Sequence, residues 1–229
     1  NNGTVIFNGN ADRNFTISTG AGIERFFNVE IDKTNNDKDI FISNDDTLAA
    51  EGTLILSNGG LKNGNALTFQ DAQLNPDFDY MSSHLWFRGS TPGTFTIDKN
   101  NLNHDGHTYI QKDNNATVTF LNTAGTRYHV GESGDLYINS GILRANNTTQ
   151  GDLNYNTIVL NPNGTFRATP FKLYISSNYT NAGGTLEHNN GTVIFNGNAD
   201  RNFTISTGAG IERFFNVEID KTNNDKDIF

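Results

Sequence analysis

The chain repeats itself: residues 1–41 and residues 189–229 carry the same sequence, NNGTVIFNGNADRNFTISTGAGIERFFNVEIDKTNNDKDIF, without one difference. Asn1 therefore corresponds to Asn189, and the distance between these two positions along the chain is the period of the repeat. A β-structure tolerates many substitutions on its outer face, so perfect identity indicates a recent duplication. We interpret residues 1–188 as one complete unit of a tandem array and residues 189–229 as the start of the next, identical unit. An artificially designed duplication is the alternative.

The composition narrows the class of protein. The net charge of −9 and the pI of about 4.9 argue against nucleic acid and anionic membranes as partners, because both attract clustered Lys and Arg. No apolar run reaches the length of a transmembrane helix, so we expect no membrane insertion in this segment. Cysteine is absent, which suits a long repeat protein whose continuous core needs no disulfides.

Many short segments alternate between apolar and polar residues, which is typical of half-buried strands. In residues 3–9 the alternation places Val5 and Phe7 on one face. The further inward pairs are Val29/Ile31, Leu54/Leu56, Phe95/Ile97, Val118/Phe120 and Leu136/Ile138, with Phe15/Ile17, Ile40/Ile42, Leu67/Phe69 and Leu173/Ile175 in shorter strands. Asn-Gly and Asn-Asp turns separate them.

The spacing of these strands predicts the architecture. Many of the gaps between main strands are about 18 to 25 residues, which is close to one turn of a β-solenoid with three short strands per coil. The sequence therefore predicts an all-β fold, a parallel β-helix, in which one unit makes eight or nine coils and advances about 40 Å. We expect one interior stack to hold a residue from each of five coils: Phe7, Val29, Leu54, Phe95 and Phe120. Tandem β-sandwich domains are the alternative, but the strand signals do not recur as hairpins.

The runs NNGTVIFNG, FFNVEIDKT and GTLILSNGGL resemble repeats of large bacterial cell-surface proteins, the adhesin-like parallel β-helices that include filamentous haemagglutinin and autotransporter stalks. The resemblance covers residues 1–60 and 178–229 and is weaker through residues 70–115. It implies a right-handed β-helix, secretion, an extracellular or cell-surface location, and an adhesive or fibre-forming role. It carries over no catalytic residue.

Candidate chemistry is sparse. The densest acidic cluster, Asp71, Asp77 and Asp79, offers oxygen ligands for Ca²⁺ or carboxylates for glycoside chemistry, but we favour its interpretation as a solvated loop. His104 and His107 flank a short turn, and two histidines are fewer than a zinc site needs. The other histidines are interpreted as isolated: His84, His129 and His188. We therefore expect no catalytic site, no metal site and no cofactor.

Two kinds of surface feature remain. Trp86 lies between Leu85 and Phe87, so alternation places it outward, as a weak candidate contact for a sugar. Asn-x-Ser/Thr sequons, each a glycan acceptor in a secreted protein and otherwise a chance match in an Asn-rich chain, begin at Asn2, Asn14, Asn115, Asn146, Asn147, Asn163, Asn178, Asn190 and Asn202.

These observations favour a structural role: a repeat of a secreted fibre, filament or adhesin stalk, whose partners are further copies of the same repeat, end to end or side by side. A glycan- or cell-binding adhesin module is the alternative, with surface glycans as partners. A polysaccharide-active β-helix enzyme is a distant third hypothesis, because the sequence groups no pair of carboxylates.

The tandem-array interpretation makes a direct prediction. Because Phe229 corresponds to Phe41, the natural chain should continue after Phe229 with Ile-Ser-Asn-Asp-Asp-Thr-Leu, a copy of residues 42–48. Sequencing the locus checks this. An unrelated continuation would end the tandem-array interpretation.

Overall fold

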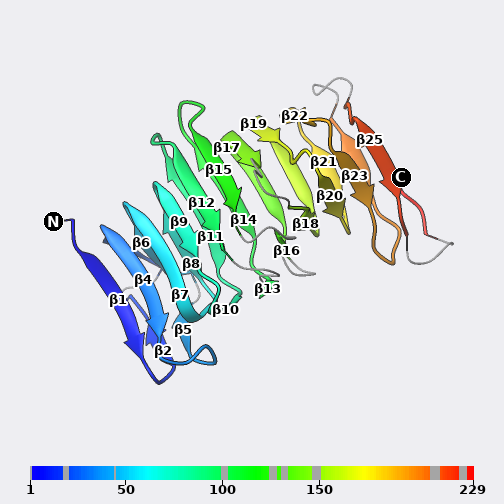
Figure 1. Cartoon of the computed structure of the whole chain (residues 1–229). Helices are drawn as coiled ribbons and strands as arrows, with labels where there is room; N and C mark the ends of the chain where they lie inside the picture. The colour runs from blue at the N-terminus through cyan, green and yellow to red at the C-terminus, as the bar shows by residue number, and fades with distance from the viewer. Residues whose placement is uncertain are drawn as a thin grey trace.

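The computed structural model is a β-solenoid, in which short strands stack along one axis (Figure 1). It describes residues 2–17, 21–43, 45–98, 103–123, 128–129, 134–145, 151–206, 212–221 and 226–229. Within these ranges there is no helix, and all pairs of named strands are parallel. The chain makes about 8 turns, so the predicted solenoid is confirmed and the hairpin-based sandwich alternative is wrong. The right-handed sense of the coil stays a prediction.

The strands form three rows that run along the axis. Row A consists of β1 (Thr4–Gly9), β4 (Asn28–Lys33), the first half of β7 (Thr53–Lys62), β9 (Asp71–Leu74), β12 (Gly93–Ile97), β15 (Thr117–Asn122), the second halves of β17 (Leu136–Ala145) and β19 (Ile158–Arg167), and β22 (Thr185–Glu187). Row B consists of β2 (Arg13–Phe15), β5 (Asp39–Ile42), the second half of β7, β10 (Phe78–Met81), β13 (Asn103–His104), β16 (Tyr128–His129), β18 (Leu153–Tyr155), β20 (Lys172–Ile175), β23 (Thr192–Phe195) and β25 (Asn216–Ile219).

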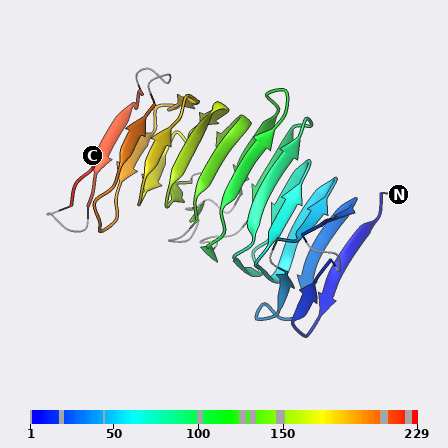
Figure 2. The ribbon, with the colours of Figure 1, turned by 180° about the vertical axis from the view of Figure 1, so that it is seen from behind.

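Row C completes each coil. Its members are β3 (Ile23–Phe26), β6 (Thr47–Ala50), β8 (Asn65–Thr68), β11 (His84–Gly89), β14 (Thr108–Lys112), the first halves of β17 and β19, β21 (Tyr179–Asn181) and β24 (Phe203–Ile205). The chain thus visits the rows in the order A, B, C, which confirms three strands per coil. Figure 2 shows the same succession from behind.

The coils differ in length because their corners differ. A short coil runs from Leu54 to its register partner Ala72, and a long one runs from Thr108 to its register partner Leu136. Strands β7 and β17 bend around a corner and so belong to two rows. Gly59 and Gly141 lie at these bends with φ of 90° and 81°, a left-handed conformation that glycine adopts without steric cost.

The interior is one continuous core built from inward side chains of successive coils. Four of the five residues expected in one stack are neighbours in register, with Ala72 between two of them: Val29, Leu54, Ala72, Phe95 and Phe120. Phe7 pairs with Ile31 instead, because Val5 takes the place beside Val29. Phe7 therefore lies in the neighbouring inward column, two positions along the strand.

Polar side chains at the corners join each coil to the next. Asp71 Oδ1 accepts a hydrogen bond from the backbone N–H of Thr94 at 2.7 Å, one coil later. Equivalent bonds link Asn28 to Thr53, Asp12 to Asp39, Asp152 to Lys172, Asn178 to Asn202 and Asp200 to Asp227. The abundance of Asn and Asp at the corners thus has a structural use: these side chains accept N–H groups that the strand ladders leave unpaired.

The two identical segments form the same local coil. Thr4 pairs with Asn28 as Thr192 pairs with Asn216. Phe7 meets Phe15 edge-on with ring centres 6.0 Å apart, and their counterparts Phe195 and Phe203 do so at 5.9 Å. The counterpart of the Lys33 Nζ hydrogen bond to Asn8 O is made by Lys221 Nζ to Asn196 O.

The two segments nevertheless begin on different rows. Strand β1 belongs to row A, whereas β23, with the same sequence, belongs to row B and pairs with β20. Row A takes eight steps from β1 to β22, and β23 follows on the next row of the same coil. One period of the repeat therefore corresponds to eight turns and one additional row.

Truncating the core should cause local damage. Phe95→Ala should cost about 3–5 kcal/mol of unfolding free energy, because transfer energy is lost and a cavity remains. Since each coil contacts only its neighbours, hydrogen exchange should accelerate in the coils that flank residue 95 and little elsewhere. Thr96→Ala, on the outer side of the same strand, is the matched control and should change little. Loss of protection over a sharply bounded half of the chain would contradict the coil-by-coil picture.

Candidate functional site: an aromatic and histidine ladder

Three aromatic side chains stack along the outer side of row C. The rings of Trp86 on β11 and Tyr109 on β14 lie 3.8 Å apart between centres, and Tyr109 and Tyr137 on β17 lie 4.9 Å apart, with the planes within 10° of parallel. The register explains this ladder, because Trp86 pairs with Tyr109 and Tyr109 with Tyr137. Coil spacing therefore stacks the rings directly, and such contacts stabilise the structure beyond area burial.

Trp86 points outward, as predicted, but protein groups occupy its ring. Tyr109 stacks on it, and the Arg88 guanidinium lies over it at 4.5 Å from the ring centre. Groups this close cannot share one face, so both faces are occupied. The indole N–H also donates to Asn65 Oδ1 at 3.0 Å. Trp86 thus offers a sugar the edge of a stacked column and no open ring face.

Leu67 is buried, as predicted, but on the outer side of row C and not in the main interior cluster. The register places Leu67 beside Trp86 on the outer side of row C, whereas its neighbour Ala66 pairs with the buried Leu85. Its burial is consistent with its position next to Trp86 and Arg88 along a shallow depression. Alternation alone did not establish the side, because both faces of this short strand carry apolar side chains.

A second ladder, of histidines, runs beside the aromatic one. The rings of His84 and His107 stack with centres 4.8 Å apart and planes 5° from parallel. His84 Nδ1 accepts the backbone N–H of His107 at 3.1 Å, and His107 Nδ1 accepts that of Asp135 at 3.2 Å. Asp135 Oδ1 continues the series by accepting the N–H of Thr157. These histidines therefore act at the corner as Asn and Asp do elsewhere.

His84 was interpreted from the sequence as isolated, and this interpretation is wrong. The signal that would have paired it with His107 is their separation of 23 residues, one coil of this solenoid. Burial, followed by the charge of His107, lowers the pKa of His84. A proton on Nδ1 would remove the acceptor that caps the next coil, so both rings serve this role only when Nδ1 is unprotonated.

His104 lies in the interior and belongs to neither ladder. It is fully buried on row B, and Nε2 lies 3.2 Å from Ser83 O. Burial lowers its pKa from 6.5 to about 4, because the charged imidazolium would lack solvation there. The charges of His84 and His107 also contribute to lowering the pKa of His104, but its burial is the largest cause.

Buried lysines also have structural partners. Lys112 Nζ donates to three carbonyl oxygens, those of Phe69, Arg88 and Thr91, at 2.6 to 2.9 Å. Burial lowers the pKa of Lys112 to about 8, a value that would suit a catalytic base. Three carbonyl acceptors use all three ammonium protons, however. Lys112 therefore stabilises a corner of the solenoid by binding carbonyl groups of two successive coils.

The acidic residues singled out in the sequence do not form one cluster. Asp71 begins β9 on row A and accepts the N–H of Thr94, whereas Asp79 is exposed on β10 of row B, next to the exposed Asp77. In the part of the chain that the structure describes, no group of three or more His, Cys, Asp and Glu side chains could hold a metal ion. Among the described residues that line an open depression of about 610 Å³ over row A, the one carboxylate is that of Glu187, which forms a salt bridge with Arg167 at 2.8 Å.

The sequons lie in varied settings. Asn178 is half-buried and its Oδ1 accepts the N–H of Asn202, so a glycan there would interfere with a corner bond. Asn146 and Asn147 lie outside the described residues, as does the side chain of His129. The remaining sequon residues are exposed: Asn2, Asn14, Asn115, Asn163, Asn190 and Asn202.

Comparisons with known proteins add no relative. No protein-family model matches the chain, and no curated protein or solved structure is significantly similar to it. The described residues include no helix long and apolar enough to cross a membrane.

His104 should make the fold sensitive to acid. Its pKa is 6.5 when unfolded and about 4 when folded, so the unfolded chain binds more protons between these values. The contribution of His104 to the unfolding free energy should therefore be fully present above pH 6.5 and be lost as the pH drops toward 4. The loss from this residue alone should be about 3 kcal/mol. Denaturant unfolding across this pH range measures it. His104→Gln should flatten the dependence, while His188→Gln, a control near the surface, should leave it unchanged; equal behaviour of the two variants would contradict the assignment.

Proposed function

We propose that the chain is a structural segment of an extended fibre or stalk, exposed outside the cell or at its surface. The observation that carries the proposal is the passage of the solenoid through the boundary between the two units. Residues 172–175 of the first unit pair in parallel with residues 192–195 of the second, and one core extends across this boundary to Phe195. Units joined in this way add length without a hinge.

The contacts between coils suit a load along the axis. Backbone ladders on three rows and the corner bonds of Asn, Asp and His side chains all connect one coil to the next. Only the first and last coils of a solenoid expose unpaired strand edges. The resemblance of the repeat runs to bacterial adhesin stalks supports the same role and the extracellular location.

An adhesive module is the second candidate, and the outer ladder of row C is the observation that favours it. The edges of Trp86, Tyr109 and Tyr137 form a continuous aromatic strip beside the guanidinium of Arg88. The occupied ring faces weaken this candidate, because sugars stack on open faces. Saturable binding to a glycan array, lost on Trp86→Ala, would favour adhesion over a purely structural role.

The fibre proposal predicts how length grows with the number of units. A chain carrying one additional copy of residues 1–188 should be longer by about 40 Å, from roughly eight coils of about 4.8 Å each, with an unchanged cross-section. Small-angle X-ray scattering measures both quantities. An increase in the cross-sectional radius, or a profile of separate compact bodies, would contradict a continuous rod.

A further inference from the structure

Two arginines lie side by side on the outer surface of row A. Arg144 on β17 and Arg167 on β19 are register partners on neighbouring strands, which lie about 4.8 Å apart. In the strand ladders of the described residues, this is the one place where two residues of like charge are register partners. Like charges directly opposite each other on neighbouring strands are destabilising. The arginine pair therefore has a cost that no other strand pair of these ladders carries.

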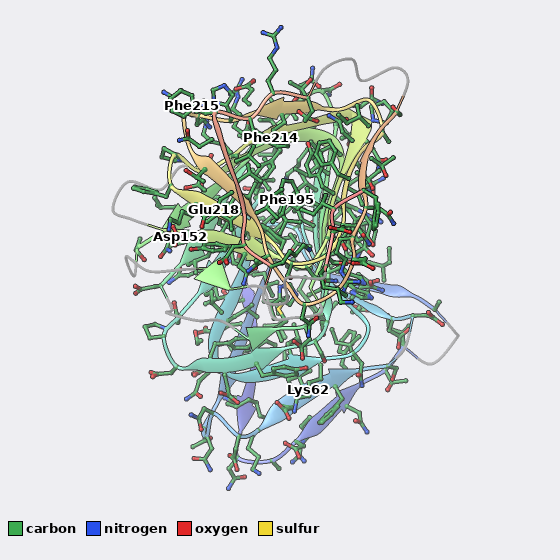
Figure 3. The ribbon with its side chains drawn as sticks, turned by 90° about the vertical axis from the view of Figure 1, so that its right-hand side faces the viewer. Lys62, Asp152, Phe195, Phe214, Phe215 and Glu218 are labelled. Carbon is green, nitrogen blue, oxygen red and sulfur yellow. The ribbon has the colours of Figure 1, made fainter. Side chains whose placement is uncertain are left out.

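The strands hold both arginine side chains outward. Successive side chains of a strand point to opposite sides, and the residues that precede the two arginines, Leu143 and Phe166, are fully buried in the core. Figure 3 looks along the solenoid from its C-terminal end and shows the same alternation, with Phe195 inside the coil and Glu218 on its outer side. Two guanidinium groups are thus presented outward from paired strands.

One of the two positive charges is balanced within the chain. Arg167 Nε donates to Glu187 Oε2 at 2.8 Å, and Glu187 is the register partner of Arg167 on the next coil. A guanidinium has five N–H donors, and this bond uses one of them. Arg144 is exposed and forms no salt bridge within the described ranges. The three side chains therefore keep one positive charge in excess, in a chain whose net charge is −9.

The two arginines line the open depression over row A. Its volume is about 610 Å³, and the other described residues along it are Ala145, Pro170, Glu187 and Asn189. This volume lies within the range of sites that hold small organic molecules and exceeds the volume of an inorganic ion. The depression therefore has room for an organic group that carries a negative charge.

We propose that Arg144 and Arg167 bind the carboxylate of an acidic sugar, a uronic acid residue of a polysaccharide. The planar guanidinium fork matches the two oxygens of a carboxylate, and a carboxylate between the two guanidinium groups offsets their repulsion. The depression accommodates the sugar ring beside its carboxylate. This inference goes beyond the proposed structural role and does not depend on it, because Arg144, Arg167 and Glu187 belong to a single unit. The site is also separate from the ladder of Trp86, which lies on row C.

The net negative charge of the whole chain sets a condition on this site. It repels an acidic polysaccharide at long range. At physiological salt, however, exposed charges further apart than about 8 Å are largely screened from each other. Binding then depends on the local excess of positive charge at Arg144 and Arg167, so the site is tested at physiological ionic strength.

Isothermal titration calorimetry of the whole chain with trigalacturonate tests the proposal. The methyl ester of the same trisaccharide lacks the negative charges and should not bind measurably. Arg144→Gln should weaken the binding of trigalacturonate about tenfold, because hydrogen bonds between two charged groups are lost. Glu187→Gln should strengthen it several-fold, because Arg167 then no longer has a competing carboxylate.

The matched controls come from Arg25 and Glu51, an ion pair at 3.7 Å whose side chains are each about half exposed. Arg25→Gln and Glu51→Gln change the net charge in the same way outside the depression, so each should leave the affinity within about twofold. Inorganic sulfate, a free oxyanion, should bind more weakly than trigalacturonate, and equal affinity would overturn the assignment to a sugar. The arginine site itself would be overturned by the absence of trigalacturonate binding, by equal losses in Arg144→Gln and Arg25→Gln, or by weaker binding in Glu187→Gln.

Discussion

Hydrogen bonding from each coil to the next is the interaction on which the rest of the structure depends. Strands of one coil have no partner within that coil, so every backbone ladder in the described residues runs along the axis. Side-chain acceptors at the corners extend these ladders where the strands end, as Asp71 does for Thr94 and His84 for His107. In-register stacking then brings like positions together, which produces both the interior column of Phe95 and Phe120 and the outer column of Trp86 and Tyr109.

In a structure stabilised by contacts between successive coils, the burial of a side chain depends on whether its coil has a neighbour on each side. Ile31 and Ile219 have the same sequence around them, yet the first is fully buried and the second is 64% exposed. The difference lies only in whether another coil follows. Stability in such a chain is a sum over neighbouring coils, so any coil with a neighbour on one side only has weaker support than the same coil between two neighbours.

The sequence was sufficient to predict the architecture but not the arrangement of the side chains on the outer surface and at the corners. Period-two alternation and a recurring spacing near one coil predicted the parallel solenoid, and they placed Val29, Leu54, Phe95 and Phe120 in one column. Alternation predicted that Leu67 is buried but not on which side of its strand, because both faces of this short strand are apolar. It also left His84 and His107 unpaired, because adjacency across coils depends on the length of each coil, and that length varies along the chain. The burial of His104 likewise depends on the path of the chain at the corner of its coil, and the local pattern of apolar and polar residues does not predict that path.

The displacement of the second copy from row A to row B has a consequence for any longer chain with this period. Three rows complete a turn, so three units would pass before a given side chain returned to the same side of the rod. The ladder that begins at Trp86 would then lie on a different one of the three sides of the rod in each successive unit. A flat neighbour pressed against one side would meet it only once in every three units. A surface feature that occurs once in each unit would thus be distributed evenly around the rod. The cause is the additional row in each period, and no unit needs a different sequence.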